Sequence, residues 1–336
     1  MSFILAFESS CDDTSVAILD TDYQILVNLI SSQPEHLEFG GVLPELASRL
    51  HMKNIMQLSQ LALAKSHLEL QDISAIAVSI NPGLIGSLLV GLSFAKALAW
   101  SLQKPLITVN HLLSHIFANY IDHPELNPPF LALVVSGGHT ELVHFETDTV
   151  FEIVGRTLDD AAGETFDKAA KLLGLGFPGG PIIDNLAQGG DTSFVNLPNP
   201  MADKDNYDFS YSGLKTAIRN YIQQQSPAFL QTHQKDIAAS IQAAIVGPLI
   251  RKSIRKAQKL KLDKILIAGG VAANSALREG LTQKAKAHHI RVFYPSLQLC
   301  MDNAAMVAAA AIPKYKAGLF APLSVNATSQ KGTRLL

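Results

Sequence analysis

Short apolar runs separated by polar turns dominate the start of the chain. Phe3–Phe7 is an apolar run, Glu8–Thr14 is a polar turn, Ser15–Leu19 is a second apolar run, and a third follows near Gln24–Ile30. Apolar runs of this length that are bounded by turn residues are typical of buried β-strands. The start of the chain therefore predicts three consecutive strands joined by turns.

Longer stretches with helical character then alternate with single strands. A helix is expected over Pro44–Lys65, with proline in its first turn, where no N–H donor is needed. A strand at Ala75–Ile80 leads into an apolar helix that ends near Leu102. A short strand at Leu106–Val109 precedes a further helix, which we expect to open at Asn110.

The second half of the chain repeats this order of elements. Its predicted elements are strands at Phe130–Val135, Glu141–Phe145 and Phe151–Gly155, a helix at about Asp160–Leu173, a strand at Lys264–Ala268, a helix from Asn274, a strand at Arg291–Tyr294 and a helix opening at Asp302. The order β-β-β-α-β-α-β-α thus occurs twice, which predicts a duplicated α/β fold with two lobes around a ligand cleft. We place the first lobe at 1–110 plus about 303–336, and the second at 111–302 with an inserted helical region at about 185–260.

The composition is that of a well-buried globular enzyme. The chain has 336 residues, enough for two domains, of which 48% are hydrophobic and 17% charged. The formal net charge is −2, whereas a protein that grips nucleic acid through its overall charge is basic. Any contact with nucleic acid must therefore use a local patch or the surface of a partner.

Cysteine usage and apolar stretches indicate a soluble cytoplasmic enzyme. Two cysteines, Cys11 and Cys300, exclude a disulfide framework and suit a reducing compartment. The N-terminus lacks a basic region and meets Glu8 too early for a signal peptide. The most apolar stretch, Gly83–Trp100, is interrupted by Lys96 and follows a strand and a turn. A buried helix is therefore favoured over a membrane span, and no membrane is expected among the partners.

Two histidines one helical turn apart form the first candidate site. His111 and His115 are at positions i and i+4, on one face of the helix after the last strand of the first half. Their imidazoles can share a cation there, although two surface or core histidines are the alternative. Asp302 holds the equivalent place in the second half. The duplication therefore predicts that its carboxylate faces the histidines across the cleft between the lobes.

This set of ligands predicts a catalytic metal. Two histidines and one carboxylate leave coordination positions open and fit Fe(II) or Zn(II). Leu112 follows His111, so the zinc-protease pattern His-Glu-x-x-His is absent and peptide hydrolysis is poorly supported.

Corresponding turns of the two halves differ in charge. Ser136–Thr140 joins two apolar strands, and its glycines let the backbone approach a ligand while successive N–H groups face an anion. A plain tight hairpin is the alternative. The turn Glu8–Thr14 is acidic and would repel a phosphate unless a metal or water intervenes, and a solvated turn is its alternative.

Two further glycine-rich elements suit a nucleotide. Gly179–Asp184 follows a helix that contains Asp167, and an aspartate beside such a turn can accept hydrogen bonds from ribose hydroxyls, although the glycines also suit a helix C-cap. Ala268–Asn274 is a strand–turn–helix element whose helix N-terminus suits a phosphate or a sugar edge. The Walker A and Gly-x-Gly-x-x-Gly patterns are absent, which disfavours P-loop and Rossmann interpretations.

One basic run interrupts the second half. Its members are Arg251, Lys252, Arg255, Lys256, Lys259, Lys261 and Lys264. A solvated helix face is favoured over an RNA contact as the interpretation of this run.

Several long motifs occur in order along nearly the whole chain. They are Glu8–Thr14, Gly41–Arg49, Asn110–His115, Val135–Thr140, Asp159–Lys168, Phe209–Lys215, Ala268–Asn274 and Asp302-Asn303. Together they closely resemble the TsaD family, the tRNA adenosine threonylcarbamoyltransferases, of the bacterial type. The resemblance implies the fold shared by actin, sugar kinases and heat-shock chaperones, in which two lobes surround a nucleotide cleft.

The resemblance also implies a reaction and its site. The threonylcarbamoyl group would pass from threonylcarbamoyl-AMP to N6 of the adenosine 3′ of the anticodon, in tRNAs that read codons beginning with A. His111, His115 and Asp302 would bind one divalent metal, with Fe(II) favoured by the family and Zn(II) as the alternative. The residues that would bind the adenylate substrate are Val134, Val135, Ser136, Gly137, Gly138, Asp167, Gly180, Asp184 and Asn274.

Roles beyond these ligands are hypotheses. Asp12 and His139 are the candidates for a catalytic base at the adenosine N6. Bacterial relatives work with a TsaB-like pseudo-paralogue and a TsaE-like ATPase, and first-lobe helices that include Pro44–Lys65 are expected to form the TsaB contact. A small-molecule kinase and a non-catalytic nucleotide-binding scaffold are the alternative functions, because one fold supports all three.

Overall fold

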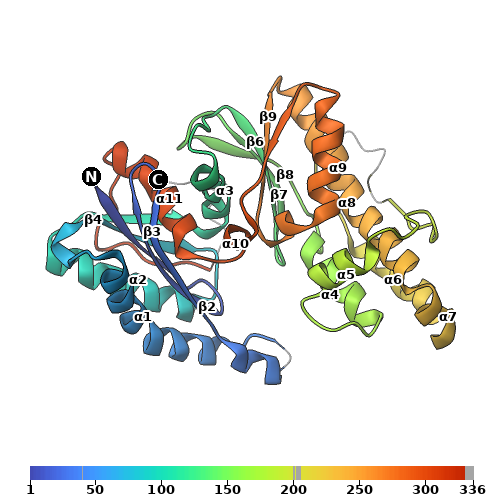
Figure 1. The fold of residues 1–336 in the computed structure, drawn as a ribbon, viewed down its shortest axis with the longest axis horizontal. Coiled ribbons are helices and arrows are strands. Elements are labelled where there is room, and N and C mark those ends of the chain that lie inside the picture. Colours follow the sequence, from blue (N-terminus) through green and yellow to red (C-terminus); the bar gives the residue numbers. More distant parts are fainter. Residues whose placement is uncertain (40, 200, 202–205, 330–336) are drawn as a thin grey trace. The chain divides into compact units, whose positions relative to one another are not determined.

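The three-strand pattern at the start of the chain forms one side of a five-stranded sheet (Figure 1). The computed structural model describes residues 1–39, 41–199, 201 and 206–329. It divides into two compact units: unit 1 comprises Met1–Leu126 and Pro295–Leu336, and unit 2 comprises Asn127–Tyr294. Each unit contains one sheet and the helices that cover it.

The sheet of unit 1 is mixed and has the order β3-β2-β1-β4-β5. Its strands are β1 (Phe3–Glu8), β2 (Asp13–Asp20), β3 (Ile25–Ser32), β4 (Ile73–Asn81) and β5 (Leu106–Asn110). β1 pairs antiparallel with β2 and parallel with β4, so the first hairpin lies beside two parallel strands. β1 and β2 are buried along nearly their whole length, as expected for strands covered on both faces.

Helices cover both faces of this sheet. They are α1 (Pro44–Ser66), α2 (Ile85–Leu102), α3 (His111–Asp122), α10 (Leu297–Cys300) and α11 (Ala304–Lys316), with short 3-10 helices η1 (Pro34–Phe39) and η2 (Leu70–Asp72). Thr14 of β2 hydrogen-bonds His51 of α1, whereas the next residue, Ser15, accepts a hydrogen bond from the Ala304 amide of α11. Successive side chains of a strand point to opposite faces. The helices α1 and α11 therefore cover opposite faces of the sheet.

Unit 2 repeats the same sheet. Its strands are β6 (Phe130–Val135), β7 (Thr140–Phe145), β8 (Phe151–Arg156), β9 (Lys264–Ala268) and β10 (Arg291–Phe293), in the order β10-β9-β6-β7-β8. Its helices are α4 (Ala162–Leu172), α5 (Gly179–Ala187), α6 (Ser212–Gln223), α7 (Pro227–Thr232), α8 (Gln234–Lys259), the 3-10 helix η3 (Gly270–Ala273) and α9 (Ser275–Lys286). An antiparallel three-strand meander followed by two parallel strands thus occurs twice, which confirms the predicted duplication.

The boundaries of the units differ from the expected ones. We expected breaks near residues 110 and 303, but unit 1 extends to Leu126 and resumes at Pro295. The reason lies in helix packing: α11 lies on β1, β2, β4 and β5, and α3 packs along α11. Both helices therefore belong to the first sheet, although α11 follows the last strand of the second.

Within the described part of the chain, two helices are long and apolar enough to cross a membrane by length and composition, Ile85–Leu102 and Gln234–Lys259. In the structure α2 packs on β4 and α1, and α8 packs on α5, α9 and β6. Both helices therefore cover other elements of their own unit. α8 is 78% buried, whereas α2 is only 33% buried, so the buried helix expected in this stretch is confirmed only in part.

Candidate active site

Two helix N-termini meet in unit 1 and carry the candidate metal ligands. Asn110 caps α3, its side-chain oxygen accepting a hydrogen bond from the Leu113 amide, and His111 is the first residue of that helix. Asn303 caps α11 in the same way through the Met306 amide, and Asp302 immediately precedes this cap. Side-chain caps fix the direction in which a chain enters a helix. The two asparagines thus set the positions of the ligands beside them.

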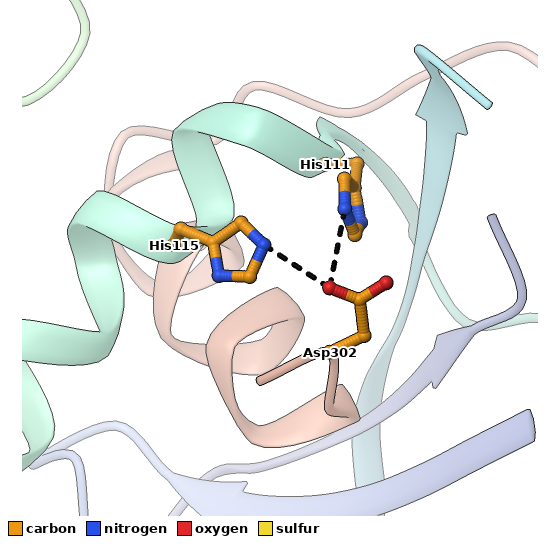
Figure 2. A group of neighbouring side chains, drawn as sticks. All are labelled: His111, His115 and Asp302. Carbon is orange, nitrogen blue, oxygen red and sulfur yellow. Dashed lines mark ion pairs between the residues drawn. The ribbon is translucent and has the colours of Figure 1, made fainter. Parts of the chain in front are cut away.

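The three predicted ligands lie together (Figure 2). Asp302 Oδ1 is 3.5 Å from His111 Nε2 and 3.2 Å from His115 Nε2, and one donor atom of each residue lies within 4.8 Å of the others. Donors bonded to one ion at about 2.0–2.2 Å are about 3.0–3.5 Å apart. The geometry and the chemistry of the donors therefore fit a divalent transition metal.

The expected placement of this group across two lobes is wrong. All three residues belong to unit 1, because α11 and α3 pack together on its sheet. The side chain of His115 is 2% exposed and that of His111 11%, whereas the Asp302 side chain is 28% exposed. The group is therefore most accessible to a ligand on the side of the aspartate.

The carboxylates of Glu8 and Asp302 favour the protonated, positively charged form of His111. Burial lowers the pKa of His111, but Glu8 and Asp302 more than offset this and raise it to about 9. Burial raises the pKa of Asp302, but the nearby His111 and His115 hold it well below its usual range. Without a metal, an imidazolium thus stands between two carboxylates, and a cation that binds must replace its proton.

Glu8 is a site residue that the sequence interpretation missed. It ends β1 with a fully buried carboxylate, whose Oε2 is 3.0 Å from His111 Nδ1, while Oε1 accepts a 2.6 Å hydrogen bond from the Ser10 amide. The Ser10 hydroxyl lies 3.1 Å from the same His111 nitrogen. Because Glu8 accepts from Nδ1–H, Nε2 is the nitrogen that loses its proton and offers its lone pair when a metal binds. The sequence signals for Glu8 were its place at a strand end and its membership of the first family motif, and neither assigned it a role of its own.

The glycine turn of unit 2 presents bare backbone. It connects β6 and β7 and is closed by a 2.9 Å hydrogen bond from the Ser136 amide to the His139 carbonyl. A Cβ atom on Gly137 or Gly138 would meet nothing within 4 Å, so both residues border open space. The N-terminus of α4 lies against this turn, because the Glu164 amide donates to the Gly137 carbonyl at 3.1 Å.

Three more expected nucleotide ligands are fixed within unit 2. Asp167 Oδ1 accepts a 2.8 Å hydrogen bond from the Gly179 amide. Asp184 accepts from the amide of Ser275 at 2.9 Å and from its hydroxyl at 2.7 Å, which ties α5 to α9. Asn274 caps α9 and donates to Gln242 at 2.8 Å. Each carboxylate can accept further hydrogen bonds.

The structure groups the expected ligands by unit. Unit 2 holds Val134, Val135, Ser136, Gly137, Gly138, His139, Asp167, Gly180, Asp184 and Asn274. Asp12 lies in unit 1, on the turn between β1 and β2 that corresponds to the turn of His139. The two candidate bases thus occupy corresponding turns of the two halves.

The sequence has close relatives of one description. Residues 24–309 match the model of the family described as TsaD: tRNA N6-adenosine threonylcarbamoyltransferase. A tRNA N6-adenosine threonylcarbamoyltransferase of Clostridium perfringens is 50% identical over 325 residues, which cover 96% of both chains. The resemblance found in the motifs is therefore confirmed.

Solved structures share the fold at low sequence identity. Full-length HypF in its phosphate- and nucleotide-bound form matches 95% of this chain and 47% of its own, with a TM-score of 0.62 and 14% identity. Component A of the (R)-2-hydroxyglutaryl-CoA dehydratase of Acidaminococcus fermentans matches 94% of this chain and 99% of its own, with a TM-score of 0.56 and 14% identity. These matches confirm the predicted fold of actin, sugar kinases and heat-shock chaperones.

Proposed function

Because the chain belongs to the TsaD family of tRNA N6-adenosine threonylcarbamoyltransferases, we propose that its donor is threonylcarbamoyl-AMP. We further propose that its acceptor is N6 of the adenosine 3′ of the anticodon, in tRNAs that read codons beginning with A. The family match carries the proposal, and the group His111, His115 and Asp302 supports it, because such a group is unexpected in a small-molecule kinase.

The transfer is an acyl-type substitution. The N6 amine attacks the carbonyl carbon of the mixed anhydride, the bond from that carbon to the phosphate oxygen breaks, and AMP leaves with the electron pair. The amine proton passes to a base, for which Asp12 and His139 are the candidates. Because the anhydride is already activated, the protein mainly has to position and polarise it. A divalent ion, Fe(II) or Zn(II), held by the three ligands would supply Lewis-acid polarisation of the carbonyl.

Unit 2 supplies the proposed adenylate contacts. The bare backbone of Val134–Gly138 suits the phosphate, since Gly137 and Gly138 border open space. Asp167 and Asp184 would accept hydrogen bonds from ribose hydroxyls, and Asn274 would contact the sugar or base edge. Gly180 also has an open Cβ direction, so a ligand can approach its backbone.

Substituting Gly163 should weaken adenylate binding. A Cβ atom there would lie 2.5 Å from the Ser136 carbonyl oxygen and 2.8 Å from Gly137 Cα, so Gly163→Ala must displace the turn. Overpacking of this kind costs about 1–3 kcal/mol, and we expect the AMP affinity to fall about tenfold or more by calorimetry. Gly213→Ala is the matched control, because its Cβ would meet nothing within 4 Å. Equal AMP affinity in both variants would contradict a phosphate cradle at this turn.

We propose the outer face of α1 as the contact for the TsaB-like partner. Met52 is 67% exposed and Met56, one turn later, is 57% exposed, which is unusual for large apolar side chains on a helix. Met52→Glu with Met56→Glu should abolish co-purification with that partner, and Glu45→Arg with Arg49→Glu should weaken it. Thr282→Glu, on exposed α9 of unit 2, is the control. Undiminished co-purification of the methionine variant would count against this face.

One experiment tests the proposed function. The protein is incubated with threonylcarbamoyl-AMP, unmodified tRNA, the TsaB-like partner and the TsaE-like ATPase, and the nucleosides are examined by mass spectrometry. We expect the modified adenosine to form. Transfer of the γ-phosphate of ATP to a small hydroxylated acceptor would instead establish the kinase alternative. Binding of AMP analogues without any tRNA modification would establish the scaffold alternative.

A further inference from the structure

The basic run from Arg251 to Lys264, which covers the end of α8 and the start of β9, contains side chains with different surroundings. Lys252 is buried, donates to the Asp208 carbonyl and lies over the Phe209 ring. Lys264 is also buried and donates to the carbonyl and the side chain of Asn127, at 2.6 and 2.8 Å. These two lysines have structural roles, so a uniform solvated helix face does not describe the run.

The other cations gather around one cavity and one aromatic ring. The cavity has a volume of about 330 Å³ between α8 and α9, and its polar lining consists of Arg251, Arg255, Gln258, Lys284 and His288. None of the described residues that line it is acidic. Arg255 also lies 5.0 Å from the centre of the Tyr207 ring, together with Lys256 at 4.7 Å and Lys259 at 5.6 Å. We call these residues, with Tyr207, the α8–α9 basic patch.

Contacts with neutral atoms hold the guanidinium groups of the patch in place. Arg251 donates to the side-chain oxygen of Asn199 at 2.7 Å, and Arg255 donates to the Asn206 carbonyl at 2.8 Å. The contact with Asn199 orients the Arg251 guanidinium and leaves its charge available. Like charges held this close repel one another and destabilise the fold unless an anion joins them. The patch is thus preorganised for a ligand with several negative charges.

The patch is too far from the proposed adenylate contacts to serve the same phosphate. Asn274 caps the start of α9, whereas Lys284 lies near its other end. At 1.5 Å per residue, ten residues of helix separate the two by about 15 Å. The cations of α8 from Arg251 to Lys259 extend over about 12 Å of helix. A single ligand that contacts all of them must carry negative charges spread over about this length.

We propose that the α8–α9 basic patch binds the phosphodiester backbone of the tRNA acceptor. This inference rests on the proposed function, which requires a polyanionic acceptor of this kind. The net charge of the chain is −2, so attraction to RNA has to come from a local concentration of cations. The patch combines arginines and lysines with an aromatic ring, and these are the side chains that contact phosphates and sugars in nucleic-acid complexes.

Charge reversal in the patch provides the test. Lys259→Glu with Lys284→Glu changes two cations of the patch. Lys235→Glu with Lys316→Glu makes the same charge change at exposed positions outside both the patch and α1. Binding of the full chain to an unmodified tRNA transcript is measured by filter retention over a range of KCl concentrations. We expect the patch variant to lose about tenfold or more in affinity, and its logarithmic salt slope to become shallower by about 1–2. The variant with Lys235→Glu and Lys316→Glu should bind tRNA as the unchanged protein does, and AMP affinity should be equal in all three proteins.

The outcomes separate this inference from the proposed function. A patch variant with unchanged tRNA affinity and salt slope overturns the inference, whether or not the protein modifies tRNA. The inference is also overturned if that variant loses a protein partner on co-purification but keeps its tRNA affinity, because an acidic protein is then the ligand. In the complete reaction, we expect the patch variant to have a raised KM for tRNA. A third outcome would overturn only the proposed function and leave the tRNA-binding surface standing: the patch variant loses tRNA binding, but the unchanged protein forms no modified nucleoside.

Discussion

Asp302→Ala should abolish metal binding and reduce transfer to background. Asp302 Oδ1 lies within 3.5 Å of both histidine Nε2 atoms and is the only carboxylate of the group. Loss of a residue that merely orients a ligand weakens metal affinity about 10–100-fold, so loss of a ligand should exceed about a hundredfold. Metal content by mass spectrometry and affinity by calorimetry measure this directly.

Chelation and a distant aspartate serve as controls for this prediction. Metal-stripped protein should lose single-turnover transfer and recover it when Fe(II) or Zn(II) is added back, which also ranks the two ions. Asp263→Ala, on the exposed surface of unit 2, should bind metal normally. Full single-turnover transfer by Asp302→Ala, or by the metal-stripped protein, would refute a role of the metal in the reaction.

Glu8→Gln should weaken metal binding about 10–100-fold, although Glu8 touches no metal. Glu8 Oε1 accepts from the Ser10 amide, so a glutamine oxygen would remain there and its NH2 group would face His111 Nδ1. His111 would then accept at Nδ1 and carry its proton on Nε2, the nitrogen that faces Asp302. The substitution thus changes the tautomer and preserves the shape of the side chain.

Metal affinity and spectroscopy distinguish this positioning role from a purely structural one. Calorimetric titration with Zn(II) and the visible spectrum of the Co(II) form should both change in Glu8→Gln, with the circular dichroism of the metal-free protein unaltered. Ser10→Ala should have a smaller effect, because Glu8 still accepts from Nδ1. Glu152→Gln, an exposed residue of β8, is the control. Zinc affinity equal to that of the unchanged protein would show that Glu8 does not orient His111.

The duplication and the three candidate ligands could be predicted from the sequence, because the order of elements and the spacing of the two histidines can be read directly from it. The alternation of strands and turns and the bounds of α1 can be predicted from the order of residues alone. The two histidines are four residues apart and therefore share one face of α3. The third ligand, Asp302, was found because it holds the same place in the second half of the chain as His111 holds in the first. Its placement across the two lobes was wrong, because sequence order does not show that α11 packs on the first sheet.

Burial of polar groups was the part that the sequence could not supply. Glu8 stands in an acidic segment that has the composition of a solvated turn, and its buried ionic partner, His111, comes from α3, which is distant in the sequence. The basic run of α8 similarly contains cations of identical type, some buried with structural partners and others at the α8–α9 basic patch. A side chain's environment depends on elements distant in sequence, which periodicity does not report.

Unit 1 is built from both ends of the chain, and this has a consequence for biosynthesis. The ribosome makes His111 and His115 early, then all of unit 2, and only afterwards Asp302 and α11. At about 5–20 residues per second, roughly 10–40 s separate the second ligand from the third. During that time the face of the first sheet that α11 later covers is open. A nascent chain therefore cannot complete its metal site before Asp302 has been made, and chaperones have an apolar surface to bind until α11 follows.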